Sequence, residues 1–379
     1  MRFKAGISAC SLFQSENQEE AIESLLRRFK KIVRAHPGLK GSFSKGKKRQ
    51  VYLNFSAHEQ DASPLVFRGK APKLLSVTSP YEEILKTCEP YIVEKAFRLF
   101  GKRDRLAKLS ILQIDEEHFL LMFSLSHLVG DGHTFYKIFN MLSSDTEIHS
   151  LQVLRRGEIS TVAEIIPREN SRFMFHPRMI FWAFRCAFSW KKMRIRSFEL
   201  NDDYVQLQKQ AAKESTMVPF LSTNDILSSS YAQLCGSNAL IMAVNFRGRI
   251  SGINENDAGN YEELLVIDSV TSSQSQNIRL LVSDLAQQSK KISLPKGPAM
   301  AKSKPVLITN WAGFSRALML EGAQELLHLP LYSSREITFD SCIVYRPHAD
   351  RVAALLFMRD LDEAAVLAHP LFQKSKKTT

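Results

Sequence analysis

The chain has 379 residues, 44% of them hydrophobic and 24% charged, which is the composition of a globular protein with one large or two medium domains. Lysines and arginines number 51 against 39 acidic residues, and the resulting net charge of +12 favours an anionic partner. That partner is a nucleotide-bearing cofactor, a nucleic acid or an acidic membrane surface. The sequence contains no zinc-finger spacing, no basic region followed by heptads and no aromatic RNA-binding signature, so we expect no nucleic-acid partner.

The cysteines and the two ends of the chain bear on its compartment. Five cysteines are scattered without any C-x-x-C pair, at Cys10, Cys88, Cys186, Cys235 and Cys342. Their number and spacing predict neither disulfides nor a metal site, and indicate a reducing compartment. Residues 1–13 lack the continuous apolar core of a secretory signal peptide, which favours a cytoplasmic protein. The final Lys376-Lys377-Thr378-Thr379 fits the dilysine pattern of proteins held at the endoplasmic reticulum membrane, and a solvated basic tail is the alternative.

The first elements follow from periodicity. Residues 21–33 carry apolar side chains at helical spacing, after a capping-box pattern at residues 15–18 and before a stop at Pro37-Gly38. This pattern predicts a long amphipathic helix. Residues 41–53 predict a hairpin with a basic turn around Gly46, and the turn is either simply solvated or a patch for nucleic acid.

Two strands and a helix are expected next, over residues 106–114, 119–125 and 134–142. The second strand is apolar on both faces, which predicts a buried central position in its sheet. It is followed directly by H-x-x-x-D-G at residues 127–132. A histidine that leaves a buried strand into a glycine-flanked turn can lie at the floor of a cleft and move a proton near neutral pH. Because three fixed positions match by chance in roughly one chain of this size in thirty, the rest of the sequence must decide.

Residues 143–218 are charged, aromatic and irregular, and we interpret them as the connection between two lobes. Within them, residues 174–190 are rich in aromatic side chains and are followed by basic residues up to Arg196. Arg178 and Arg185 interrupt this stretch, which is also too short to span a bilayer. Aromatic and basic side chains together suit a helix at a membrane surface, so residues 174–196 predict peripheral membrane contact. A helix packed on the protein's own surface is the alternative.

Strands and helices alternate again in the last part of the chain. Helices are expected at residues 225–234 and 278–292, and strands at residues 239–246, 263–270, 305–311, 341–346 and 352–358. Strands mixed with helices in both halves predict an α/β architecture with more than one sheet.

Four features occur in order along the chain: H-x-x-x-D-G at residues 127–132, S-T-N-D-I-L-S-S at residues 222–229, N-F-R-G-R at residues 245–249 followed by Gly259-Asn260, and T-N-W at residues 309–311. In this order they resemble the chloramphenicol acetyltransferase-like superfamily, and among its members the BAHD acyl-CoA-dependent acyltransferases. Residues 35–41, where the first helix turns into a strand, are a fifth point of similarity. The resemblance therefore spans nearly the whole chain.

Three departures qualify the resemblance. Ser126 stands where the condensation domains of peptide synthetases usually have an extra histidine, which BAHD enzymes lack. The D-F-G-W-G motif of plant BAHD enzymes is missing after Trp311, which argues against a standard plant member more than against activity. The chain is also short for the family, so the acceptor pocket and its loops are the parts least transferable.

The resemblance implies an α/β fold of two chloramphenicol acetyltransferase-like lobes with mixed sheets and the active site at their interface. Residues 1–165 would form the N-terminal lobe, residues 166–204 the aromatic and basic connection, and residues 205–379 the C-terminal lobe. The implied activity is the transfer of an acyl group from acyl-CoA to a hydroxyl or amine acceptor, by direct attack and without an acyl-enzyme. No permanently bound cofactor or metal is expected. We expect a monomer, with a lipophilic small-molecule acceptor because of the aromatic stretch at residues 174–190.

The roles of individual residues follow from the same resemblance. His127 is the expected general base. Thr309 and Trp311 are the expected donors to the oxyanion, with packing at a strand end as the alternative. Asp131 is expected to brace the turn through an ion pair with Arg247, because a residue four positions from the histidine in a tight turn would point away from the cleft. Gly132 would supply backbone freedom and close approach, and Lys302 and Lys304 would meet the coenzyme A phosphates or remain solvated.

Two other functions stay open. The first is a condensation-type enzyme that takes its acyl group from a carrier-protein thioester. The second is a catalytically silent relative that binds a membrane or a protein partner through the basic aromatic segment. The joint presence of His127, Asp131 and Gly132 counts against the second.

Overall fold

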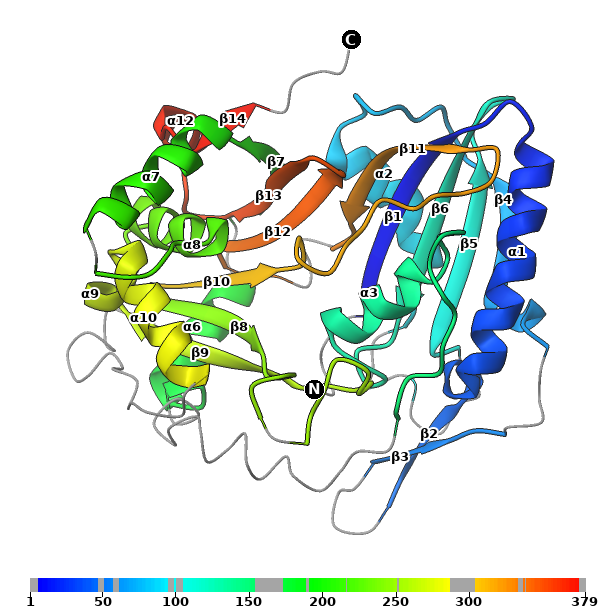
Figure 1. Ribbon diagram of the computed structural model, residues 1–379, viewed down its shortest axis with the longest axis horizontal. Coiled ribbons are helices and arrows are strands. Elements are labelled where there is room, and N and C mark those ends of the chain that lie inside the picture. The colour runs from blue at the N-terminus through cyan, green and yellow to red at the C-terminus, as the bar shows by residue number, and fades with distance from the viewer. Residues whose placement is uncertain are drawn as a thin grey trace.

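Two mixed β-sheets form the centre of the computed structural model, and helices pack against each of them (Figure 1). The structure describes residues 6–46, 51–56, 61–94, 99, 105–153, 173–188, 191–215, 217–250, 252–286, 304–332, 337 and 339–374. The predicted α/β architecture of two lobes with mixed sheets is confirmed. The predicted lobe boundary at residues 165 and 166 lies outside the described residues.

The first sheet has the strand order β11-β1-β6-β5-β4, and all its pairs are antiparallel except β4 with β5. Its strands are β1 (Ile7–Gln14), β4 (Val66–Lys70), β5 (Ala107–Gln113), β6 (His118–Leu125) and β11 (Gln324–Pro330). Its helices are α1 (Gln18–Ala35), α2 (Tyr81–Cys88) and α3 (Gly132–Asn140), and a separate hairpin joins β2 (Ser42–Lys45) to β3 (Val51–Asn54). The central position predicted for the apolar strand is confirmed, because every residue of β6 after His118 is buried. The predicted hairpin is also confirmed, and residues 47–50 of its basic turn lie outside the described residues.

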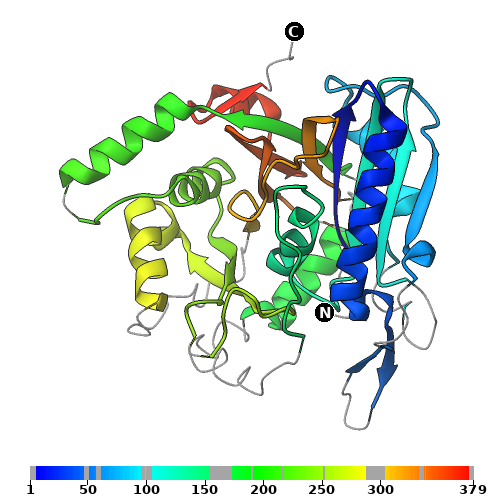
Figure 2. The same cartoon turned by 45° about the vertical axis from the view of Figure 1, so that its right-hand side comes forward.

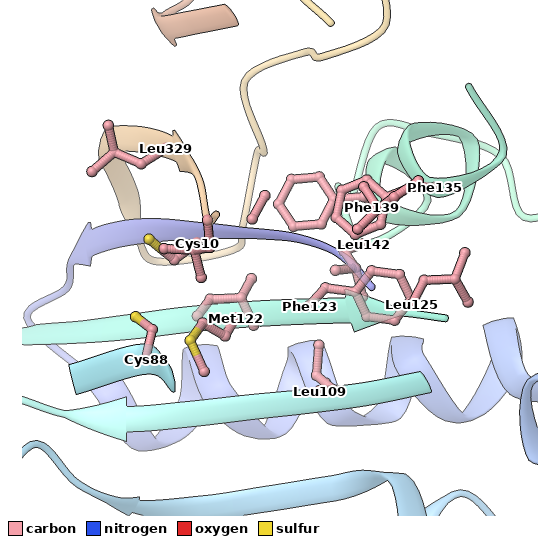
Figure 3. Packing of buried hydrophobic residues seen from close by; sticks show 14 of the residues in the cluster. Cys10, Cys88, Leu109, Met122, Phe123, Leu125, Phe135, Phe139, Leu142 and Leu329 are labelled. Carbon is pink, nitrogen blue, oxygen red and sulfur yellow. The ribbon is translucent and has the colours of Figure 1, made fainter. Parts of the chain in front are cut away.

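The side chains of β6 alternate between two helix layers (Figure 3). On one face the ring of Phe123 lies 5.4 Å from that of Phe135 in α3 and 6.4 Å from that of Phe29 in α1, centroid to centroid. On the other face Leu120 lines a small cavity together with Ile84 of α2. Burial on both faces fixes the C-terminal end of β6, from which His127 emerges.

Helix α1 begins at Gln18 and ends at Ala35, two to three residues beyond the predicted range at each end. The predicted capping box at residues 15–18 is wrong: the N-cap is Asn17, whose side chain accepts the Glu20 N–H, while the Ser15 hydroxyl donates to the carbonyl of Gly322. The helix ends before Pro37, as predicted, because proline cannot donate the next helical hydrogen bond.

The second sheet has the order β14-β7-β13-β12-β10-β8-β9 and is likewise mixed. Its strands are β7 (Arg194–Leu200), β8 (Ala239–Asn245), β9 (Glu262–Asp268), β10 (Pro305–Asn310), β12 (Ser341–His348), β13 (Arg351–Met358) and β14 (Phe372–Lys374). The helices of this half are α6 (Pro177–Ala187), α7 (Asp202–Ser215), α8 (Thr223–Leu234), α9 (Ser269–Ser272), α10 (Ser275–Ala286) and α12 (Glu363–Ala368). Leu240 packs in the cluster that contains α8 and α10, whereas Ile241 packs against Met179 of α6, so the two sets of helices cover opposite faces. The predicted end of the α10 helix, residues 287–292, lies outside the described residues.

Two strands pair in a different sheet from the one that their position in the sequence predicts (Figures 1 and 2). β7 lies within the predicted connection, residues 166–204, but pairs with β13 and β14 in the second sheet. β11 lies within the predicted C-terminal lobe, residues 205–379, but pairs with β1 at the edge of the first sheet. Each of the two lobes therefore contains a strand that the sequence division assigned elsewhere. The sequence could not show this, because the periodicity of a strand indicates how it is buried and not which sheet it joins.

Candidate active site

The H-x-x-x-D-G turn lies between β6 and α3 and contacts the loop that joins β8 to β9 in the other lobe. The backbone N–H of Asp131 donates to the carbonyl of Gly259 at 3.0 Å, and the N–H of Gly259 donates to the Thr134 hydroxyl at 3.0 Å. One loop of the second lobe, residues 246–261, thus contacts the turn directly. This contact brings the first and third sequence motifs together across the interface between the lobes.

Asp131 is fully buried and binds groups from both lobes. It is the N-cap of α3, where its Oδ1 accepts the Thr134 N–H at 3.0 Å. Its carboxylate also receives both Arg247 amino groups, at 2.8 and 3.1 Å, and the backbone N–H of Tyr261 at 2.9 Å. The predicted ion pair with Arg247 is confirmed, and both side chains are at most 1% exposed.

Arg247 is held by more than the carboxylate. Its Nε donates to the carbonyl of Asp257 at 2.8 Å, and its Nη2 donates to the carbonyl of Gly259 at 3.1 Å. The guanidinium also lies 4.8 Å from the centre of the Tyr261 ring. A buried arginine whose donors are satisfied in this way fixes the shape of the 246–261 loop as well as its position against Asp131.

His127 is 7% exposed, and its ring is oriented by Asn260 from the opposite lobe. The Nδ1 atom lies 2.8 Å from Asn260 Oδ1, and Asn260 Nδ2 donates to the His127 carbonyl at 2.9 Å. Because a carbonyl can only accept, the amide NH₂ must face it, so the amide oxygen must face Nδ1. Nδ1 therefore carries the proton, and in the neutral ring Nε2 holds the free electron pair.

Asn260 belongs to the third motif, but the sequence predicted no role for its side chain. Glu262, two residues further on, was also missed. Its Oε1 lies 3.3 Å from His127 Nε2, and its side chain is 20% exposed. Both contacts join positions more than 130 residues apart, and the only hint in the sequence was the Gly259-Asn260 pair after Arg247.

The structure supports the predicted close approach at Gly132 but not the predicted backbone freedom. Gly132 is not among the glycines with positive φ. A Cβ built on Gly132 would lie 3.1 Å from Nε1 of Trp311, and one on Gly130 would lie 2.5 Å from the Thr134 side chain. The turn is thus packed closely both on itself and on the indole of the T-N-W motif.

Trp311 follows β10 and is brought to the turn, where it is 4% exposed. Its ring lies 5.9 Å from that of Tyr136 and 5.6 Å from that of Tyr332. Thr309 is half-buried near the end of β10 beside Ile343, on the same side of the strand as Trp311. Between them, Asn310 donates to the Asn224 side chain at 3.0 Å, so the T-N-W and S-T-N-D motifs also meet.

Of Lys302 and Lys304, the two lysines predicted to meet the coenzyme A phosphates, the structure describes only Lys304. Lys304 is exposed and begins the approach to β10, and its Nζ donates to the carbonyl of Cys235 at 3.2 Å, at the end of α8. At about 3.3 Å per residue, it lies roughly 20 Å along the strand from Trp311. Lys302 lies outside the described residues.

His133 is adjacent to the motif but turned away from His127. Its Nε2 lies 3.0 Å from the carbonyl of Glu255, and burial lowers the pKa of its imidazole. Ser126, on the other side of the motif, is buried, and its hydroxyl accepts the Leu128 N–H at 3.4 Å. Within the described ranges, no three His, Cys, Asp or Glu side chains are grouped as metal ligands would be.

No protein-family model matches this chain, and no curated protein matches it in sequence. Solved structures do share its fold. TRI101 of F. graminearum, complexed with coenzyme A and deoxynivalenol, is 12% identical and has a TM-score of 0.64, with 97% of this chain and 94% of that chain covered. The first condensation domain of the CDA synthetase is also 12% identical, with a TM-score of 0.55 over 93% and 85% of the chains.

A third similar structure is polyketide synthase associated protein 5 of Mycobacterium tuberculosis, which is 13% identical with a TM-score of 0.57 over 96% and 91% of the chains. The chain has the chloramphenicol acetyltransferase-like fold. It thus spans nearly the full length of each of these two-lobed structures, and the fold expected from the motif order is confirmed.

Proposed function

We propose that this protein is an acyltransferase that moves an acyl group from acyl-CoA to a hydroxyl or amine acceptor. The observation that carries the proposal is the pairing of His127 with Asn260, which fixes the proton on Nδ1 and leaves Nε2 with the electron pair. A base needs that arrangement to receive a proton from an acceptor. The fold shared with TRI101, whose structure holds coenzyme A, supports acyl-CoA as the donor.

In the proposed reaction, His127 Nε2 removes the acceptor proton while the acceptor oxygen or nitrogen attacks the thioester carbon. The negative charge that develops on the carbonyl oxygen requires hydrogen-bond donors, and we assign this role to Trp311 and Thr309. When the C–S bond breaks, the imidazolium returns its proton to the departing thiolate. Asn260 keeps the ring in one tautomer throughout, and Asp131 with Arg247 keeps the two lobes in register around it.

The donor site follows from the same assignment. The net charge of +12 favours the phosphates of coenzyme A, and Lys302 and Lys304 are the residues that we assign to them. Lys304 stands at the far end of β10 from Trp311, so a long cosubstrate would extend along this strand with its thioester at the histidine.

An acceptor screen tests the proposal. The purified protein is incubated with acyl-CoAs of several chain lengths and a panel of alcohols and amines, and both free thiol and the mass of the acylated product are measured. We expect thiol release that depends on the acceptor. A parallel reaction with acyl carrier protein addresses the condensation-type alternative, which the similarity to a condensation domain favours. Exclusive use of the carrier thioester would contradict acyl-CoA as the donor.

We expect Asn260→Ala to lower kcat/KM by about 10²-fold, because a ring that is free to rotate or change tautomer is misplaced by an ångström or more. The measurement is steady-state thiol release. Asn256→Ala is the matched control, since this asparagine is in the same loop with an exposed side chain. Equal rates for the two variants would remove Asn260 from the mechanism.

We also propose that α6 attaches the protein to a membrane surface. No helix in the described part of the chain is long and apolar enough to cross a bilayer. Four aromatic side chains at α6 are nonetheless 60–77% exposed: Phe175, Phe181, Phe184 and Phe188. Phe175 and Phe184 line an open pocket of about 280 Å³, and Arg178, Arg185 and Lys191 are also exposed in this segment. Residues 189–190 of the predicted segment lie outside the described residues, and the inner side of α6 packs on the sheet through Met179.

The triple variant Phe181→Ser/Phe184→Ser/Phe188→Ser is expected to weaken binding to vesicles containing anionic lipid by at least about tenfold, because each ring loses burial in the interface. Cosedimentation measures the bound fraction. The control is Leu74→Ser/Val270→Ser/Met319→Ser, which removes three apolar side chains that are 58–77% exposed elsewhere. If both triple variants sediment alike, α6 is not the attachment site.

A further inference from the structure

The open pocket at α6 lies against the same face of the second sheet as the candidate active site. Its walls are hydrophobic side chains of α6 and of the two residues at 174–175, together with Ile241 of β8 and Phe339. Trp182 of α6 packs on Phe339, with the ring centroids 5.1 Å apart. The volume of about 280 Å³ is close to the lower limit of small-molecule pockets, which is about 300 Å³. The pocket therefore suits a narrow apolar group.

The register of the strands relates this pocket to His127. Side chains alternate along a strand, so Ile241, Ala243 and Asn245 of β8 share the face that α6 covers. Asn245 pairs with Glu262 of β9, whose Oε1 lies 3.3 Å from Nε2 of His127. Four residues at about 3.3 Å each separate Ile241 from Asn245, so the pocket and the histidine are roughly 13 Å apart along the strands.

The part of the sheet between the pocket and the histidine is accessible on this face. Ala243, Leu264 and Thr309 lie side by side on β8, β9 and β10, and each is half-buried. On the opposite face, Val244 and Ile308 are fully covered, in the cluster that contains α8 and α10. Ala243, Leu264 and Thr309 thus form a half-exposed strip that leads from the pocket towards the histidine. A hydrocarbon chain lying on this strip would remove apolar surface from water.

We propose that the pocket at α6 and the half-exposed strip bind the hydrocarbon chain of a long-chain acceptor, whose hydroxyl or amine lies at Nε2 of His127. This inference rests on the proposed function and defines its acceptor as a linear amphiphile. Lys304, which we assign to coenzyme A, contacts the end of α8 on the opposite face of the sheet, so the donor nucleotide and the acceptor chain do not compete. Because α6 is also the element that we assign to membrane attachment, the acceptor would come from the lipid phase.

The length of the acceptor tests this inference. Hexanol is less than about 9 Å long at about 1.5 Å per bond and cannot reach the pocket, whereas hexadecanol, more than twice as long, can. Ala183 is exposed and lines the pocket, so Ala183→Phe fills the pocket and Ala183→Asp places a charge in it. We expect both variants to lower kcat/KM for hexadecanol with acetyl-CoA by at least about tenfold, and that for hexanol by no more than about twofold. At about fourfold per buried methylene group, two displaced groups already give this loss.

Ala211→Phe and Ala211→Asp are the matched controls, because Ala211 is an exposed alanine of α7 that does not line the pocket. Equal losses for hexadecanol at the two positions, or no loss in either Ala183 variant, would overturn the assignment. A second arm combines palmitoyl-CoA with hexanol. A loss confined to this pair would place the acyl chain of the donor in the pocket and contradict the proposal.

Binding without turnover separates this inference from the proposed function. Hexadecanol is titrated into each protein, and the fluorescence of Trp182 in the pocket wall, taken as the difference from the corresponding Trp182→Phe variant, reports occupancy. We expect a saturable change in the wild-type and Ala211→Phe proteins that Ala183→Phe loses. No change in the wild-type protein would overturn the chain site while acyl transfer itself stood. If no compound of the acceptor screen is acylated, the proposed function fails separately, and the titration still decides whether the pocket binds the chain.

Discussion

His127→Ala is expected to lower kcat/KM for acyl transfer by a factor of about 10² to 10⁴, the contribution of a positioned general base. The residual rate would come from positioning of the two substrates and from the oxyanion donors, which the substitution leaves in place. Thiol release at saturating acyl-CoA measures the effect. Because Asn260 would lose one of its two bonds to residue 127, circular dichroism and thermal unfolding must accompany the kinetics.

His133→Ala is the matched control for this experiment. It removes the other imidazole of the same turn, which is buried and lies beside Glu255 rather than Asn260. We expect it to change kcat/KM by only a few-fold. Comparable losses in the two variants would show that the turn as a whole, and not the imidazole of residue 127, supports the reaction.

Local sequence predicted the elements around the site well. β6 was predicted from its apolar run, and α3 from helical spacing after the turn. One prediction for Asp131 is confirmed: its ion pair with Arg247 exists and is buried. The ion pair could be predicted because the two residues belong to motifs that occur in the same order in a known superfamily. The resemblance thus indicated a contact between residues 116 positions apart.

The contacts that orient His127 could not be predicted in the same way. Asn260 and Glu262 stand in a loop and at a strand start, where neither periodicity nor composition limits a side chain to one partner. Their roles depend on how the 246–261 loop meets the turn, which is a property of the assembled lobes. β11 shows the same limit, because its pairing with β1 depends on an open sheet edge more than 300 residues away.

The loop between β8 and β9 therefore has two functions at once. Through Arg247 and Gly259 it binds the turn and fixes the start of α3, and Asn260, together with Glu262 at the start of β9, reaches the two nitrogen atoms of His127. Any shift of the second lobe relative to the first would move both sets of contacts together. Stability of the interface and orientation of the base are thus coupled in this molecule.

Arg247→Ala is expected to destabilise the protein by about 3 to 5 kcal/mol, because it leaves the Asp131 carboxylate buried without its counter-charge. The carbonyl of Asp257 would lose the Nε donor as well, and the carbonyl of Gly259 would lose one of its donors but keep the Asp131 N–H. Urea unfolding followed by tryptophan fluorescence measures the change in the free energy of unfolding. Trp311 is a natural reporter, since its indole packs on Gly132 in the same turn.

The loss of stability expected for Arg247→Ala is large because the ion pair is buried, and Arg68 on the surface provides a comparison. Arg68 also bonds two carboxylates, Glu19 and Glu23, but all three side chains are 39–71% exposed, so Arg68→Ala should cost no more than about 1 kcal/mol. Adding Asp131→Asn to Arg247→Ala should recover part of the loss, because the asparagine keeps the cap of α3 and removes the isolated charge. An Arg247→Ala protein no less stable than Arg68→Ala would contradict a structural role for the buried pair.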